Sequence, residues 1–149
     1  MQIPNDLFFS WVESEIAEGR SVRFRSKGVS MYPLIRGDKD EILLSPCCHK
    51  DLAVMDVVLF RYRGQHVLHR IVHREGDLLT LKGDGSYTAV EECAVDDVIG
   101  RVKAVIRPSG RVISTDSWKW KLPGGIWCRM GVLRKPVLRF IQLTKQVIQ

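Results

Sequence analysis

The sequence predicts a mainly β protein, built from a single antiparallel, barrel-like folded sheet with a helix near each end of the chain. Short runs of alternating apolar and polar residues recur between Ser21 and Ile106, and turn residues separate them. No stretch between these runs is long enough for the crossover helices that parallel strands need. The 149 residues, 45% hydrophobic and 27% charged, suit one globular domain with a sizeable core.

The first 20 residues predict a helix. Asn5 or Asp6 can cap it, its apolar residues recur at helical spacing, and Gly19 ends it. The alternation of residues 21–25 then predicts a strand. The expected organisation of the chain has three parts: an N-terminal helix over 1–20, a β domain over 21–106 and a C-terminal extension over 107–149.

Further strands are expected along the β domain, over residues 41–44, 54–62, 66–73, 78–82 and 98–106. Arg63-Gly64 predicts a hairpin turn between two of them. Because side chains alternate along a strand, His69, Ile71 and His73 should share one face. Arg70 should then lie on the opposite face.

The C-terminal extension carries the positive charge of the chain. Residues 107–149 hold nine Lys or Arg and one acid, Asp116, whereas the rest of the chain holds 14 basic and 16 acidic residues. Tryptophans alternate with basic residues around Pro123, and an apolar stripe after Pro136 predicts an amphipathic helix. Such a helix fits either an anionic membrane surface or a docking face on the domain. No readout motif indicates nucleic acid.

A serine, a histidine and an acid occur in the order that acyl transfer can use. Ser30 lies on a predicted bend, since Gly28 permits a close turn and Pro33 prevents a helix from continuing. His69 lies in a β-branched run, and Asp84 follows Gly83. A serine hydroxyl becomes nucleophilic when a neighbouring base takes its proton, and a carboxylate often orients that base.

These residues belong to blocks that resemble the type I signal peptidase superfamily, which also holds the self-cleaving domains of LexA-type repressors. The blocks are Gly28-x-Ser30-Met31-x-Pro33 with Arg36-Gly37-Asp38, then Asp56 to Phe60, Leu68-His69-Arg70-Ile71, Lys82-Gly83-Asp84 and Val98 to Val102. They cover roughly residues 21 to 106. The resemblance implies a serine endopeptidase on a mostly β fold, similar to the Ser-His branch of endoplasmic-reticulum and sporulation-type enzymes.

By this resemblance Ser30 is the nucleophile, His69 is the base, and Gly28 and Met31 belong to the substrate site. The third member of the triad is expected to be Asp84, with Glu91 and Glu92 as alternatives because the block after Gly85 departs from the family pattern. Two other residues could serve as the base, Lys82 if it is desolvated and, less favourably, His73. The resemblance implies an extended peptide substrate, such as a leader or signal-like peptide.

The alternative function is a catalytically inactive peptide-binding or regulatory module on the same fold. No cofactor is expected. Cys47-Cys48-His49 could indicate zinc, but adjacent cysteines ligate one ion poorly, and the four cysteines show no repeated Cys-x-x-Cys spacing. Neither a signal peptide nor a membrane-spanning run occurs. We therefore expect a cytoplasmic protein; peripheral contact of its extension with the inner membrane face is the alternative to docking of the C-terminal helix on the domain.

Overall fold

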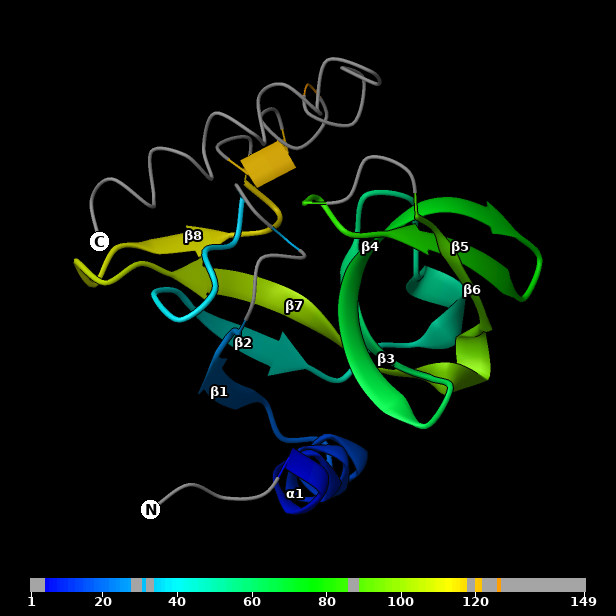
Figure 1. Ribbon diagram of the computed structural model, residues 1–149, viewed down its shortest axis with the longest axis horizontal. Coiled ribbons are helices and arrows are strands. Elements are labelled where there is room, and N and C mark those ends of the chain that lie inside the picture. Colours follow the sequence, from blue (N-terminus) through cyan, green and yellow to red (C-terminus); the bar gives the residue numbers. More distant parts are fainter. Residues whose placement is uncertain are drawn as a thin grey trace.

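The structure is a computed structural model that describes residues 5–27, 31, 34–85, 89–117, 120–121 and 126. A helix, α1 (Asn5–Ala17), precedes an eight-stranded sheet (Figure 1). Its strands are β1 (Val22–Arg25), β2 (Glu41–Ser45), β3 (Val57–Tyr62), β4 (Gln65–Glu75), β5 (Leu78–Lys82), β6 (Glu91–Ala94), β7 (Val98–Ile106) and β8 (Val112–Ser114). Single 3-10 turns cover His49–Asp51 and Val95–Asp97.

All strand pairs in the described residues are antiparallel, in the order β1-β2-β7-β3-β4-β5-β6, with β8 paired to β7. The predicted antiparallel sheet is confirmed, but the sheet does not close into a barrel. The two halves diverge because β7 pairs with β3 near its start and with β2 and β8 near its end. Figure 1 shows β3 to β6 curled to one side of β7 and β1, β2 and β8 spread to the other.

The β3–β4 hairpin is apolar on both faces and therefore has a core on each side. One face carries the first cluster, to which β3 contributes Val57 and Leu59 and α1 contributes Val12 and Ile16. The other face carries the second cluster, which lies inside the curl of β3 to β6 and includes Phe60. Cross-strand partners share a face, so each residue of β4 can be assigned to one cluster from its partner on β3.

An irregular register between β3 and β7 changes which residues of β7 face which cluster. Between β3 and β7 the register shifts between Leu59 and Phe60, so Gly100 pairs with Leu59 while Val98 pairs with Phe60. A bulge of this kind adds one residue to one strand, so the side chains beyond it face the opposite side of the sheet from the one that strict alternation predicts. Gly100 also packs closely against β2, since a Cβ there would lie 2.9 Å from the carbonyl oxygen of Ser45.

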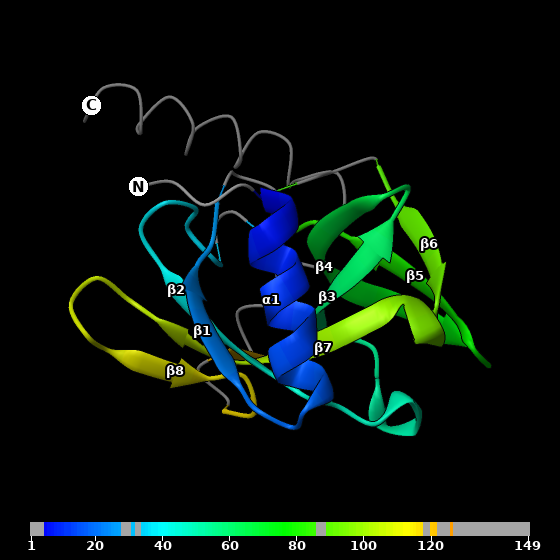
Figure 2. The same cartoon turned by 90° about the horizontal axis from the view of Figure 1, so that it is seen from below.

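The predicted N-terminal helix is confirmed, and α1 lies across the sheet (Figure 2). The ring of Phe9 stacks on that of His66 in β4, with centroids 4.5 Å apart. Glu13 accepts hydrogen bonds from the Nε of Arg61 (2.5 Å) and pairs with Nε2 of His66 (3.2 Å). These contacts attach α1 to the hairpin that carries His69.

The sheet continues beyond residue 106, into the segment that the sequence assigned to the extension. Strand β8 pairs with β7, and Trp120 is buried in the first cluster. The sequence did not predict β6 or β8, since both are short, and β6 consists of two charged residues followed by two small ones, with no apolar alternation. The predicted amphipathic helix after Pro136 lies outside the described residues.

Candidate active site

Strand β4 presents two buried polar side chains on opposite faces. His69 pairs with Val58, so it faces the second cluster, and Arg70 pairs with Val57, so it faces the first. Their residues are 9% and 0% exposed. The opposite orientation expected from strand alternation is therefore present, and the two side chains have separate environments.

His69 lies against a carboxylate from the edge strand β6. Its Nδ1 is 2.8 Å from Oε2 of Glu91, and the side chains of His69 and Glu91 are 11% and 18% exposed. The curl of the sheet makes this contact possible, because Glu91 pairs with Leu81, which in turn pairs with Ile71 on the His69 face of β4. The ring of Phe60, with its centroid 6.1 Å away, packs beside the imidazole.

This contact fixes the proton distribution on the imidazole. When Nδ1 donates its proton to a carboxylate, Nε2 of the neutral ring carries the lone pair and can accept a proton. No residue in the described part of the chain hydrogen-bonds to Nε2 of His69. The pair formed by His69 and Glu91 therefore has the arrangement of a general base with an orienting carboxylate.

Asp84 has a different role in the structure. Its two carboxylate oxygens accept hydrogen bonds from Nε and an Nη of Arg70 at 2.9 and 2.7 Å, and both side chains are 1% exposed. Arg70 also donates to the carbonyl oxygen of Met55 and lies over the ring of Trp120, 5.4 Å from its centroid. The carboxylate next to the imidazole of His69 thus comes from Glu91, while that of Asp84 neutralises a buried guanidinium.

The other candidate residues are separated from His69. His73 was expected on the face of His69, but a register shift between Ile71 and His73 places it opposite Thr80, on the other face and exposed. Lys82 pairs with Arg70 and so shares the face of Arg70. Glu92 is exposed and pairs with Thr80.

Ser30 and Gly28 lie outside the described residues, and the nearest described residues are Lys27 before them and Met31 after them. Met31 is buried in the first cluster, and its carbonyl oxygen accepts a hydrogen bond from the backbone N–H of Ile35. The backbone N–H of Ser26 donates to the carbonyl oxygen of Asp40 (3.1 Å). Ser26 and Met31 are therefore both held by backbone hydrogen bonds to residues of the turn that follows.

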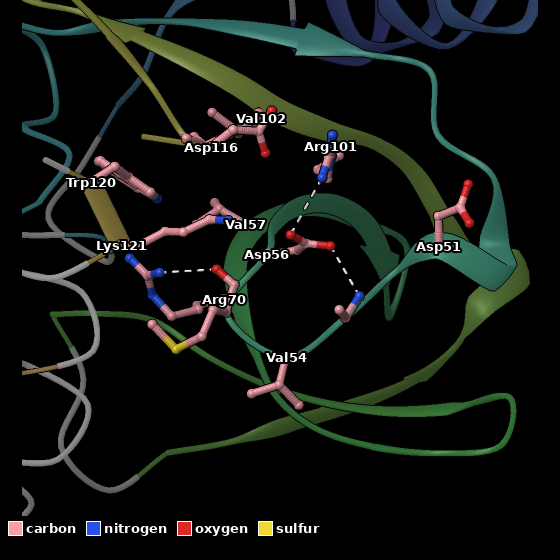
Figure 3. Close-up of a pocket in the computed structure, with 13 residues that line it drawn as sticks. Asp51, Val54, Asp56, Val57, Arg70, Arg101, Val102, Asp116, Trp120 and Lys121 are labelled. Atoms are coloured by element: carbon pink, nitrogen blue, oxygen red, sulfur yellow. Dashed lines mark hydrogen bonds and ion pairs between the residues drawn. The ribbon is translucent and has the colours of Figure 1, made fainter. Parts of the chain in front are cut away.

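A pocket of about 250 Å³ opens on the Arg70 face of the hairpin (Figure 3). One wall is Asp56, which accepts a hydrogen bond from the backbone N–H of Ala53 and lies 3.6 Å from the guanidinium of Arg101. Neither His69 nor Glu91 lines it. The pocket and the candidate active site are thus on opposite faces of β4.

The described cysteines and histidines do not gather into a metal centre. Within the described residues no group of three or more His, Cys, Asp or Glu side chains is close enough to share an ion. The thiols of Cys47, Cys48 and Cys93 are free. Burial, together with the charge of Asp97, raises the pKa of Cys93 to about 11, and burial also raises that of Cys47. Both of these thiols therefore stay protonated at neutral pH.

None of the helices in the described part of the chain has the length and apolar character that crossing a membrane requires. The membrane contact expected of the basic extension concerns residues outside that part, and it stays a prediction. Comparison of the chain with protein-family models and with curated proteins gives no match.

Proposed function

We propose that this protein is a serine endopeptidase that resembles signal peptidases and cleaves leader-like peptides through an acyl-enzyme. The observation that carries the proposal is the contact of His69 with Glu91. An imidazole that is nearly buried, oriented by a carboxylate through Nδ1 and directed away from the buried Arg70–Asp84 pair has the features of a general base. Ser30 supplies the nucleophile.

In the proposed reaction Nε2 of His69 takes the proton of the Ser30 hydroxyl while the oxygen attacks the scissile carbonyl. The tetrahedral oxyanion accepts hydrogen bonds from backbone N–H groups, including that of Ser30. His69 then gives its proton to the leaving amine as the C–N bond breaks, which leaves an ester on Ser30. Water, deprotonated by His69, attacks this ester; His69 then returns the proton to the Ser30 oxygen as the ester C–O bond breaks and the second product, a carboxylic acid, leaves. Glu91 accepts the hydrogen bond from Nδ1 and stabilises the imidazolium that forms twice in the cycle.

The substrate that fits this site is an extended segment with small residues before the cut, as the resemblance implies. Within the residues that the structure describes, β1 and β6 end the sheet order, and we infer that an added strand pairs with the outer edge of one of them. Strand β6 carries Glu91, and β1 leads toward Ser30 along the chain. Main-chain hydrogen bonds would hold the backbone of a peptide aligned along such an edge. Its side chains would point alternately to the two faces of the sheet, so every second side chain would contact the protein on the same face.

The test uses the full chain with a set of synthetic leader-like peptides and a fluorophosphonate probe that acylates reactive serines. Wild-type protein should cleave at one position and take up the probe on Ser30, and Ser30→Ala should do neither. Glu91→Gln should lower kcat by roughly 100-fold or more, because general-base catalysis contributes on this scale. The matched control is Glu92→Gln, which makes the same chemical change one residue away on an exposed side chain and should leave kcat unchanged.

The outcomes separate the candidate functions. Peptide binding without cleavage or probe uptake would replace the proposal with the non-catalytic peptide-binding module. Equal effects of Glu91→Gln and Glu92→Gln would refute the orienting role of Glu91. Activity should fall on acidification, since imidazolium cannot accept a proton; activity that appears only in alkaline solution would assign the base to Lys82.

A further inference from the structure

Two exposed arginines lie along β1, the strand at one end of the sheet order. Val22 belongs to the first cluster and Phe24 packs against it. Arg23 and Arg25 alternate with these residues, so both arginines lie on the opposite face of the strand, where they are exposed. Within the described residues no strand pairs with the second edge of β1, and Figure 1 shows β1 beyond β2 at this end of the sheet.

The positive charge of β1 exceeds the negative charge beside it. Nε of Arg23 donates a hydrogen bond to the carboxylate of Glu41 in β2 (2.5 Å), and Glu41 is also the cross-strand partner of Arg25. One carboxylate therefore lies beside two guanidinium groups, and the side chain of Arg23 is still 57% exposed. Lys27, two residues beyond Arg25, is exposed as well. This end of the sheet thus keeps a net positive charge.

The turn formed by residues 34–40 adds to this charge. Two backbone hydrogen bonds hold it beside the residue after β1, from the N–H of Ser26 to the carbonyl oxygen of Asp40 (3.1 Å) and from the N–H of Asp38 to that of Ser26 (2.8 Å). The turn carries two exposed bases, Arg36 and Lys39, and one exposed acid, Asp38, while Asp40 is buried. The strand and the turn together therefore present an excess of basic side chains.

Charged side chains on an edge strand often serve to prevent unwanted pairing. Here they disfavour the pairing of two β1 edges, since like charges directly opposite each other are destabilising. The same positions attract a strand of opposite charge, so edge protection does not exclude such a partner. The other end of the sheet has the opposite character, because β6 carries Glu92 on its exposed face and Glu91 beside His69. An acidic strand is therefore favoured at β1 and disfavoured at β6.

We propose that the outer edge of β1 binds an extended acidic segment of the substrate peptide, with acidic residues at alternate positions beside Arg23 and Arg25. An added strand forms main-chain hydrogen bonds with the edge, and its side chains on one face lie about 4.5 to 5.5 Å from those of β1, measured between Cβ atoms. The inference rests on the proposed function and names the charge of the substrate segment. It concerns binding, which can be measured without cleavage.

The test measures binding of fluorescein-labelled peptides of equal length to the full chain by fluorescence anisotropy. One peptide alternates threonine with glutamate, and two others carry glutamine or lysine in place of glutamate. A fourth has the composition of the first in a Thr-Thr-Glu-Glu repeat, which divides the carboxylates between the two faces of a strand. The alternating acidic peptide should bind most tightly, and about two- to fivefold more tightly than the Thr-Thr-Glu-Glu peptide of the same charge.

Variants of β1 locate the binding surface. Arg23→Gln with Arg25→Gln should weaken binding of the alternating acidic peptide about 2- to 30-fold, because two cross-strand charge pairs are lost. Arg23→Glu with Arg25→Glu should instead prefer the lysine peptide. The matched control, Lys50→Gln with Arg63→Gln, removes the same charge from exposed positions outside β1 and should change the affinity by less than about twofold. In the complex, hydrogen exchange should slow at the amides of β1 and stay unchanged at those of β6.

Equal affinity for the two acidic peptides, or an equal loss in the control variant, would overturn the proposal in favour of non-specific attraction. Binding of none of the peptides would leave the arginines as edge protection alone. Self-association of the wild-type protein that Arg23→Gln with Arg25→Gln abolishes would make a second copy the occupant of the edge.

These outcomes are independent of the test of the proposed function. Cleavage of leader-like peptides without any preference for acidic segments would refute the acidic edge and keep the peptidase. Tight binding of the alternating acidic peptide without cleavage or probe uptake would refute the peptidase and keep the acidic peptide as the ligand of β1.

Discussion

The structure predicts that Asp84 stabilises the fold and that Glu91 serves the chemistry, and replacing each by its amide tests this. Asp84→Asn leaves Arg70 charged and 1% exposed with no full counter-charge on its Nε and Nη groups. Removing one partner of a buried ion pair costs about 3 to 5 kcal/mol of unfolding free energy. Glu91→Gln changes a pair whose side chains retain some exposure, and it should cost roughly 1 kcal/mol or less.

Urea unfolding followed by tryptophan fluorescence measures both variants. With a denaturant slope of about 2 kcal/mol/M, Asp84→Asn should lower the unfolding midpoint by about 1.5 to 2.5 M. Glu91→Gln should lower it by about 0.5 M or less, although its kcat falls. The double replacement Arg70→Met with Asp84→Leu should recover much of the lost stability, since it removes both charges together.

A midpoint for Asp84→Asn within 0.5 M of wild type would refute the structural role of the buried pair. The kcat of Asp84→Asn should be measured where that variant is fully folded. If it falls while Glu91→Gln keeps the wild-type kcat, Asp84 rather than Glu91 would be the carboxylate that serves His69.

The attachment of α1 and the close packing of β7 give two further predictions. Burial acts to raise the pKa of Glu13, but hydrogen bonds from Arg61 and His66 outweigh it and the net shift is downward. Its carboxylate therefore stabilises the fold above the ordinary pKa of 4.5, and this contribution is lost as the pH falls through the lowered pKa. Glu13→Gln should cost up to about 1 kcal/mol at pH 7, and the difference from wild type should shrink as the pH falls below 4.5, which urea titrations at a series of pH values measure. A difference that stays constant over this acidic range would contradict the reasoning. Gly100→Ala should lower the unfolding free energy by about 1 to 3 kcal/mol, because the added Cβ would lie 2.9 Å from the carbonyl oxygen of Ser45, and an unchanged midpoint would show that the strands can separate without cost.

Much of the fold could be read from local patterns. The helix at residues 5–17, the hairpin at Arg63-Gly64 and the strands between residues 22 and 106 other than β6 follow from apolar periodicity and turn residues, which act over a few neighbouring positions. Alternation likewise placed His69 and Arg70 on opposite faces. The pattern gave no sign of the bulge that turns His73 away from that face, since a bulge depends on how two strands pair.

What the sequence by itself determined is the set of chemical groups and their order along the chain: a serine on a predicted bend, a histidine in a strand and acids after a glycine turn. The sequence could not choose among Asp84, Glu91 and Glu92. A shift of one residue along a strand moves a side chain to the other face of the sheet, and the pairing of the strands determines which side chains become neighbours. The tertiary structure shows which of these carboxylates lies beside the imidazole of His69. The curl from β3 to β6 brings Glu91 to Nδ1 of His69, and burial of Arg70 requires the charge of Asp84 on the opposite face.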